Sequence, residues 1–162
     1  MDEDQSKLIG VAQHLKERVE AQRVAHYRAG DHLRVLHYTL GLLLILISAL
    51  VSGSVLQASG DNPSQALTLT AGALSVAVVV LTSVQTTFKL GERSEQHRSA
   101  AVGFGGIARK LEVFVNRGHA DIEAAWTELT AIEKEIDNVE AGAPGFHRST
   151  YEAALEQVRA EG

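Results

Sequence analysis

Two long stretches without a charged side chain decide the fold of this protein: residues 35–60, VLHYTLGLLLILISALVSGSVLQASG, and residues 62–88, NPSQALTLTAGALSVAVVVLTSVQTTF. An α-helix rises about 1.5 Å per residue, so roughly 20 apolar residues cross a hydrocarbon core of about 30 Å. A helix inside a soluble bundle rarely runs so far without a charge, because one of its faces normally meets water. The pattern therefore predicts two membrane-spanning helices, at about residues 36–57 and 66–88.

Basic side chains around the two stretches predict their orientation. They flank both outer ends: Lys16, Arg18, Arg23, Arg28 and Arg34 before the first stretch, and Lys89, Arg93, Arg98 and Arg109 after the second. The connecting turn around Gly60, Asp61, Asn62 and Pro63 has no Lys or Arg. Because Lys and Arg accumulate on the cytoplasmic side, we expect a multi-pass hairpin in the plasma membrane with both termini in the cytoplasm. A stretch of 34 residues with many charged side chains precedes the first span, so the span does not have the pattern of a secretory signal.

Composition excludes several classes of site. The 162 residues carry 15 Lys and Arg against 20 Asp and Glu, and a net charge of −5 argues against a nucleic-acid partner. The chain has no Cys, which excludes disulfides, thiolate metal sites and cysteine nucleophiles. His26, His32 and His37 are 6 and 5 residues apart, not an i, i+4 pair, so we predict no metal site and no cofactor. No catalytic motif stands out, and we expect the protein not to be an enzyme.

Residues 1–34 predict an amphipathic cytosolic helix, with Leu8, Leu15 and Val19 on its apolar face. This face could pack on the C-terminal helices of the same chain or lie on the lipid surface. Acidic side chains such as Glu17 and Glu20 favour the first alternative, because anionic lipid would repel them.

Residues 89–162 predict a cytosolic helical region that ends in a helical hairpin and a short last helix. Phe104, Ile107, Leu111 and Phe114 follow helical spacing, and Gly118 is a stop signal. Two heptad positions follow it, occupied by Ile122, Leu129 and Ile136 and by Ala125, Ile132 and Val139. These residues suit an intramolecular hairpin or a coiled coil between subunits equally well. With residues 35–88 as the membrane hairpin, the predicted fold class is an all-α membrane protein.

The second span carries a line of small and hydroxyl side chains at intervals of 4, 3, 7 and 4, which places them on one helical face. We call this line the hydroxyl stripe: Thr68, Gly72, Ser75, Thr82 and Thr86. Such a stripe permits close packing with a neighbouring helix. It also suits the lining of a water-filled path surrounded by several copies of the helix. The sequence leaves both interpretations open.

Nearly the whole chain resembles the SLATT family of two-transmembrane effectors associated with bacterial nucleotide signalling. The segments that carry the resemblance are Arg23–Arg28 and His37–Gly41 around the first span, then His97, Ala100, Ala101, Phe104 and Arg109 after the second, and Pro144 with Tyr151 near the end. Phe104 stands where a Tyr is often found in that family.

The resemblance implies a homo-oligomeric effector that breaches the bacterial inner membrane in anti-phage or other conflict systems. A separate sensor protein or a nucleotide signal would trigger it. Two alternatives remain from the residues themselves. The hairpin could be a passive anchor for cytosolic helices that recruit partners, or the protein could be a housekeeping channel. The second is less favoured, because the spans lack the acidic and basic residues that ion pathways commonly use.

Overall fold

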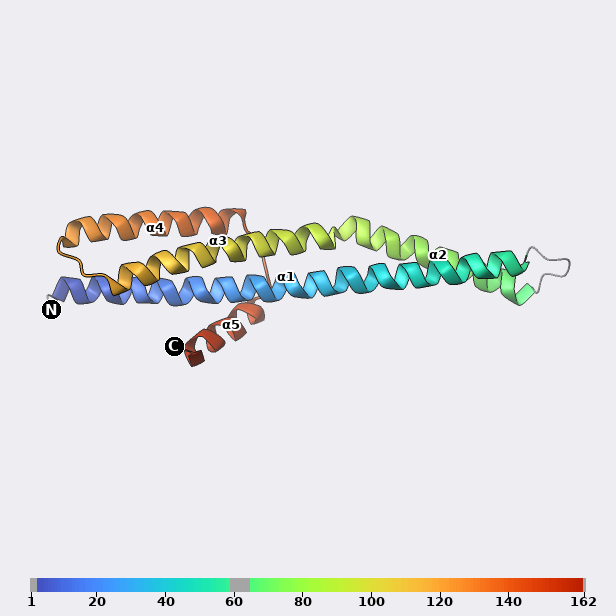
Figure 1. Cartoon of the computed structure of the whole chain (residues 1–162), viewed down its shortest axis with the longest axis horizontal. Coiled ribbons are helices and arrows are strands. Elements are labelled where there is room, and N and C mark those ends of the chain that lie inside the picture. The colour runs from blue at the N-terminus through green and yellow to red at the C-terminus, as the bar shows by residue number, and fades with distance from the viewer. Residues whose placement is uncertain (1–2, 59–64, 162) are drawn as a thin grey trace. The chain divides into compact units, whose positions relative to one another are not determined.

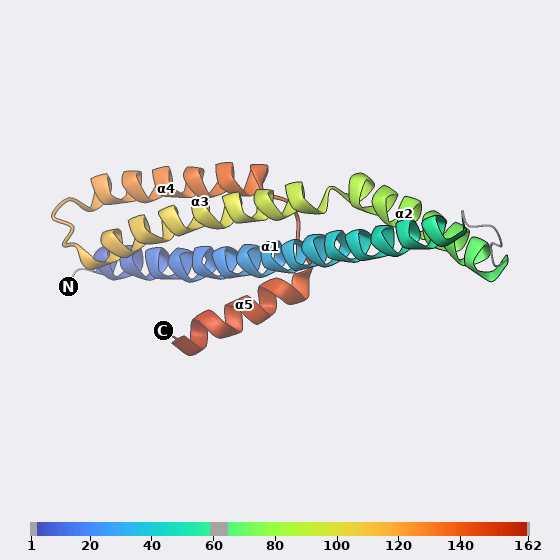
Figure 2. The same ribbon diagram turned by 45° about the vertical axis from the view of Figure 1, so that its right-hand side comes forward.

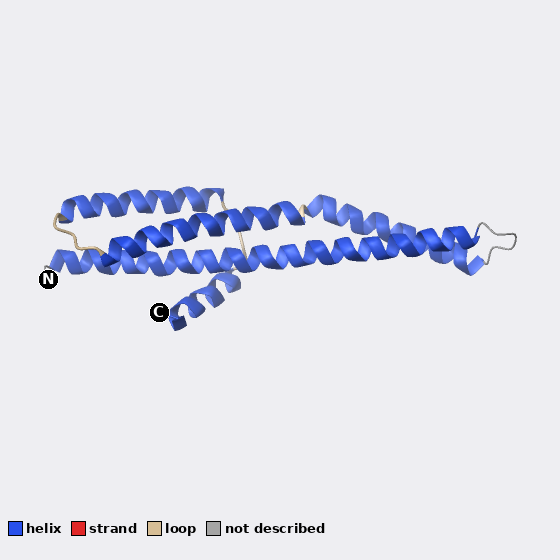
Figure 3. Ribbon diagram, viewed as in Figure 1, coloured by secondary structure: helices blue, strands red, loops and turns tan. Residues whose placement is uncertain are grey.

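The computed structural model describes residues 3–58 and 65–161, and the secondary structure in these ranges is helical (Figure 3). The helices follow one another as α1 Glu3–Ala58, α2 Gln65–Phe88, α3 Leu90–Asn116, α4 Ile122–Gly142 and α5 Arg148–Glu161 (Figure 1). The predicted all-α class with two long apolar helices is confirmed. The turn expected around Gly60, Asp61, Asn62 and Pro63 lies outside the described residues.

Helix α1 continues for 56 residues, straight through the expected boundary after residue 34. The chain divides into two compact units. The helical bundle holds Met1–Asp31 and Arg93–Gly162, and the hairpin unit holds His32–Glu92. The first part of α1 therefore does not form a region of its own. A helix with one apolar face must cover that face, and the C-terminal helices do so.

In the helical bundle, α3 and α4 both pack on the first part of α1 around one core, and α5 lies on the other side of α1 (Figure 2). The core is formed by apolar side chains of three helices: Leu8, Ala12, Leu15 and Val19 from α1, Ala100, Phe104, Ile107, Ala108, Leu111 and Phe114 from α3, and Ala125, Leu129, Ile132 and Ile136 from α4. The amphipathic N-terminal face thus packs on the chain's own helices, as its acidic residues indicated.

Two glycines of α3 allow neighbouring helices to approach closely. A Cβ atom at Gly103 would lie 3.3 Å from both terminal carbons of Val139 on α4. A Cβ at Gly105 would lie 3.3 Å from Cδ of Arg23 on α1. A side chain at either position would crowd the residue that faces it, Val139 or Arg23. Glycine is therefore accommodated here despite its cost in a helix of about 1 kcal/mol.

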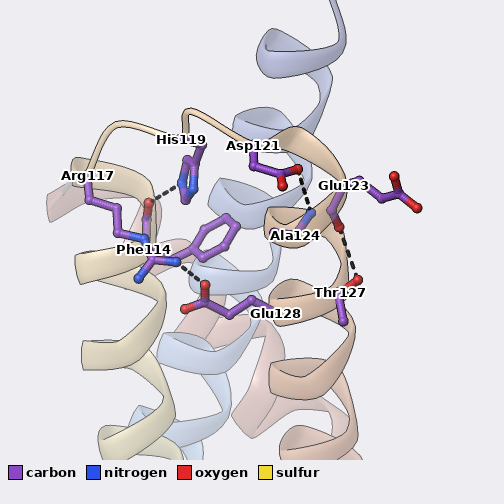
Figure 4. A network of polar contacts seen from close by, with 8 residues as sticks. All are labelled: Phe114, Arg117, His119, Asp121, Glu123, Ala124, Thr127 and Glu128. Atoms are coloured by element: carbon purple, nitrogen blue, oxygen red, sulfur yellow. Dashed lines mark hydrogen bonds and ion pairs between the residues drawn. The ribbon is translucent and has the colours of Figure 1, made fainter.

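The connection between α3 and α4 is held by polar contacts (Figure 4). Asp121 caps α4 by accepting a hydrogen bond from the backbone N–H of Ala124 at 3.0 Å, one of the donors that a helix start leaves unpaired. The ring of His119 bonds the carbonyl oxygen of Phe114 at 2.8 Å. Arg117 pairs with Glu128 across the two helices. These contacts fix the reversal of the chain that the sequence signalled with Gly118.

Candidate functional site

The two apolar helices of the hairpin unit contact each other along a seam. On α2 the seam includes five of the less exposed residues, which recur every three or four positions: Ala71, Leu74, Val78, Leu81 and Gln85. Ala77 and Val84 beside them are also half-buried. On α1 the corresponding residues are Leu40, Leu44, Ile47 and Val51. The Gln85 side chain donates a hydrogen bond to the carbonyl oxygen of His37 at 3.2 Å and so joins the two helices at one end of the seam.

The hydroxyl stripe does not belong to this seam. Its five members, Thr68, Gly72, Ser75, Thr82 and Thr86, are exposed. Each of Gly72, Ser75 and Thr82 directly follows a seam residue, and one residue turns an α-helix by about 100°. The stripe therefore lies on the flank of α2 next to the seam. Packing against the chain's own first span does not account for it.

Three hydroxyl groups of the stripe bond back to their own helix. Ser75 donates to the carbonyl oxygen of Ala71 at 2.8 Å, Thr82 to that of Val78 at 2.8 Å, and Thr86 to that of Thr82 at 2.9 Å. A bond of this kind satisfies the donor without a partner helix. The oxygen lone pairs remain on the outer surface, where they can accept hydrogen bonds from water or from another chain.

Apolar side chains dominate the rest of the hairpin surface. The most apolar 18-residue stretches of the two helices have mean hydropathies of 2.1 and 1.7, and 0% and 6% of them are buried in the structure. A core helix of a soluble protein would be mostly buried. Leu42, Ile45 and Leu50 on α1 and Leu69 and Val76 on α2 are all more than half exposed. Surfaces of this kind require an apolar surrounding, so both helices are candidate membrane spans.

A buried histidine pair lies in the helical bundle. His26 of α1 and His97 of α3 are 2% and 4% exposed, and their Nδ1 atoms are 3.0 Å apart. A hydrogen bond at this distance requires one ring to donate and the other to accept, so the accepting ring is neutral and the two rings are not both protonated. Burial, followed by the charge of His97, lowers the pKa of His26 to about 4. Burial, followed by the charge of Arg93, lowers the pKa of His97.

Aromatic rings and a close helix crossing surround this pair. The His26 ring stacks on Phe104 at 5.5 Å and meets the edge of Phe146 at 4.7 Å, between ring centroids. One turn further along α1, the carbonyl of Gly30 accepts a hydrogen bond from the hydroxyl of Ser94 at 2.8 Å. The histidine pair and this hydrogen bond therefore hold α3 against α1 close to Asp31, the last residue of α1 that belongs to the bundle.

Sequence reasoning considered His26 for a metal site and did not connect it with His97. The helical spacing of the buried residues on α1 and α3 could have indicated this pair. His26 continues the apolar face of Leu8, Leu15 and Val19, and His97 lies one turn before Ala100 and Ala101 on the buried face of α3. Among the described residues, no three His, Asp or Glu side chains are grouped so that they could hold a metal ion.

Most of the residues that carried the family resemblance or the heptad pattern are packed inside the bundle. Of the residues that carried the family resemblance, His97, Ala100, Ala101 and Phe104 are buried, Pro144 is half-buried and Arg109 is exposed. Of the heptad residues, Leu129, Ile132 and Ile136 are buried in the bundle core, whereas Ile122 and Val139 are half-buried. The heptad pattern is thus used within one chain, against α1 and α3.

The comparison with known proteins gives one match. Residues 15–161 match the family described as the SMODS and SLOG-associating 2TM effector domain, family 4. No curated protein and no solved structure matches the chain.

Proposed function

This chain belongs to the SMODS and SLOG-associating 2TM effector domain family 4, and we propose from that premise that it permeabilises the bacterial inner membrane as a homo-oligomer. In this proposal both termini lie in the cytoplasm, and a separate sensor protein or a nucleotide signal acts on the helical bundle. The result is loss of the membrane barrier in an anti-phage or other conflict system.

The observation that carries the proposal is the uncovered hydroxyl stripe. A single hairpin leaves Ser75, Thr82 and Thr86 exposed beside the seam, although most of the remaining surface of α2 is apolar. In a ring of copies, the flank beside the seam is well placed to meet a neighbouring copy or a central path. Hydroxyl oxygens that accept hydrogen bonds suit a wetted path, and leucine or valine would suit lipid better.

The proposal also restricts where copies can touch. Leu129, Ile132 and Ile136 are covered by α1 and α3 of the same chain, so they do not supply an intersubunit coiled coil. Assembly contacts must therefore come from the spans or from the outer surface of the bundle. The exposed apolar side chains of α1, with Ile45 and Leu50 among them, are available for this in the single chain.

The test compares two pairs of leucine substitutions on α2. Ser75→Leu with Thr82→Leu changes the stripe. Thr70→Leu with Ser83→Leu changes two hydroxyls that are also exposed and also bond to the carbonyl four residues earlier, but lie off the stripe. The readout is release of a dye from vesicles that contain the full chain, together with the mass of the detergent-solubilised particle.

We expect the stripe pair to reduce dye release several-fold with unchanged particle mass, because a leucine-lined constriction excludes water. The control pair should leave release as in the wild type. Equal release from both pairs, or a monomeric mass for the wild type, would contradict the proposal. The rival hypothesis is a passive anchor for cytosolic helices, and it predicts a wild type that never releases dye.

A further inference from the structure

A groove runs along the outer surface of the helical bundle between α3 and α4. It consists of two adjoining cavities of about 370 and 570 Å³, which share Gly106, Lys110 and Glu135 among their lining residues. Gly103 and Gly106 leave room in the groove because they carry no side chain, and Val113, which also lines it, is 63% exposed. We call this feature the α3–α4 groove.

One cation of the groove has no partner among the described residues. Lys110 pairs with Glu135 at 2.6 Å, and Arg117 pairs with Glu128. The guanidinium of Arg109 makes no hydrogen bond or ion pair with any described residue. A groove with one free positive charge suits a single carboxylate better than a polyphosphate, which would need several free donors.

Helix α5 carries a matching carboxylate. Its two other acidic side chains bond to side chains of the same helix. Glu156 is exposed and has no partner in the described part of the chain. Ala153 and Ala160, three residues before it and four after it, are also exposed and lie on the same face. The same spacing recurs on α3 in residues that line the groove: Gly106, Arg109 and Val113.

The groove and α5 lie on opposite sides of α1, and both views show α4 and α5 in this way (Figure 1, Figure 2). Val19 of α1 faces the core that α1 shares with α3 and α4. Ala21 is fully buried outside this core, and two residues turn an α-helix by about 200°. Arg28 lies on the same side of α1 as Ala21 and donates to Gln157 of α5 at 2.6 Å. Neighbouring copies can therefore meet head to tail, the kind of contact that can close a ring.

The level of Arg109 along the bundle can be read from its neighbours on α3. A Cβ atom at Gly105 would lie 3.3 Å from Cδ of Arg23 on α1. Further along α3, Glu112 pairs with Lys16 of α1 at 3.7 Å. Arg109 lies between these two contacts, so its level is between those two residues of α1.

The same reading places Glu156 at an overlapping level. Glu156 directly precedes Gln157, which bonds Arg28 of α1. Arg159 follows, and it pairs with Glu17 of α1. Helices α3 and α5 thus both run toward the N-terminus of α1 and are parallel to each other. A rotation about an axis parallel to α1 preserves level and direction, so it can bring these two free charges of neighbouring copies together.

We propose that the α3–α4 groove receives α5 of a neighbouring copy in a parallel arrangement, with Arg109 donating to the carboxylate of Glu156. The inference rests on the proposed function for the homo-oligomer and names a contact that holds it together. The alanines on either side of Glu156 face Gly106 and Val113, and their small size lets the helices lie close. Two grooves that faced each other would bring two free arginines together, because the groove carboxylates are already paired.

The first test reverses the two charges. Arg109→Glu and Glu156→Arg each place like charges opposite each other, so we expect each to lower the oligomeric share of the detergent-solubilised full chain several-fold, as measured by particle mass. The double variant should restore this share, because the pair forms again with opposite signs. The matched control is Arg98→Glu, an exposed arginine of α3 outside the groove, which should leave the mass as in the wild type. A loss in only one single variant, or in neither, would overturn the contact, and so would a double variant without restoration.

Cysteine cross-linking tests the contact without changing any charge. The chain has no cysteine, so Val113→Cys with Ala160→Cys gives two unique exposed sites. These sites lie on opposite sides of one chain, and a disulfide requires Cα atoms within about 7 Å. Oxidation of the full chain in membranes should therefore produce a ladder of linked chains. Val113→Cys with Thr130→Cys, an exposed site of α4 outside the groove, should produce none.

The outcomes separate this contact from the proposed function. A ladder, together with a wild type that never releases dye, supports the contact and refutes permeabilisation. An oligomeric wild type that releases dye, together with no ladder, overturns the contact and leaves permeabilisation standing.

Discussion

The two parts of helix α1 place similar apolar side chains in opposite surroundings. In the helical bundle, Leu8 and Val19 are fully buried against α3 and α4. In the hairpin unit, Leu42 and Ile45 of the same helix are 60% and 68% exposed. The backbone is one continuous helix throughout, so helix formation itself does not distinguish the two regions.

The difference lies in what covers the apolar surface. Burial of apolar surface contributes about 25 cal/mol per Å² and drives the bundle to form from the chain's own helices in water. The hairpin helices cover only a narrow seam between them and leave the remaining apolar surface for a surrounding that the described residues do not supply. The bundle thus covers its own apolar surface, whereas the hairpin needs an apolar surrounding such as lipid.

The largest expected effect comes from emptying the bundle core. Phe104→Ala removes a fully buried ring and should lower the free energy of unfolding by about 3–5 kcal/mol. Ile45→Ala removes a side chain that is 68% exposed in the described chain, so we expect a much smaller loss. Amide hydrogen exchange in detergent measures both, at α4 for the first variant and at α1 for the second. A comparable loss for Ile45→Ala would show that another copy covers this position.

Acid should weaken the bundle through His26. Its pKa is about 4 in the folded chain against 6.5 for an ordinary imidazole, so the unfolded chain binds the proton more readily. The stabilisation is complete above about pH 6.5 and falls by about 3 kcal/mol as the pH approaches 4. Exchange protection of α3, measured from pH 7 to pH 5, should show this decline.

Two variants separate His26 from the other groups that titrate in this window. His26→Gln should flatten the decline, whereas His14→Gln changes an exposed histidine of the same helix and should leave it intact. An unchanged decline in His26→Gln would show that the buried pair is not its cause.

A smaller effect distinguishes two glycines of α1. A Cβ at Gly30 would lie 3.2 Å from the backbone oxygen of Ser94 and 3.3 Å from Cβ of His97, whereas a Cβ at Gly53 meets nothing within 4 Å. Gly30→Ala must push α1 and α3 apart, and we expect a net loss of about 1 kcal/mol after the gain in helix propensity. Gly53→Ala should stabilise its part of the helix slightly. Local hydrogen exchange at each site checks both, and a gain at Gly30 would mean that the crossing is loose.

The sequence predicted the bounds of the helices better than the contacts between them. The second span was expected at residues 66–88, and α2 begins at Gln65 and ends at Phe88, the last residue before the charged Lys89. The stop signal at Gly118 follows α3 by two residues. The helix bounds agree with these expectations because hydropathy and turn preferences are local properties of the chain, and the crossing of a membrane by α2 stays a prediction. The hydroxyl stripe was visible for the same reason, since helical spacing alone places its members on one flank.

The sequence by itself determined how charged and apolar side chains are distributed along the chain. It has two uncharged helices, charged segments that flank them, and apolar faces with helical spacing. Tertiary structure decided which faces meet. It paired His26 with His97 across 71 positions, directed the heptad residues inward, and left the hydroxyl stripe uncovered. Contacts between distant segments depend on how helices cross in space, and periodicity within one helix does not specify that crossing.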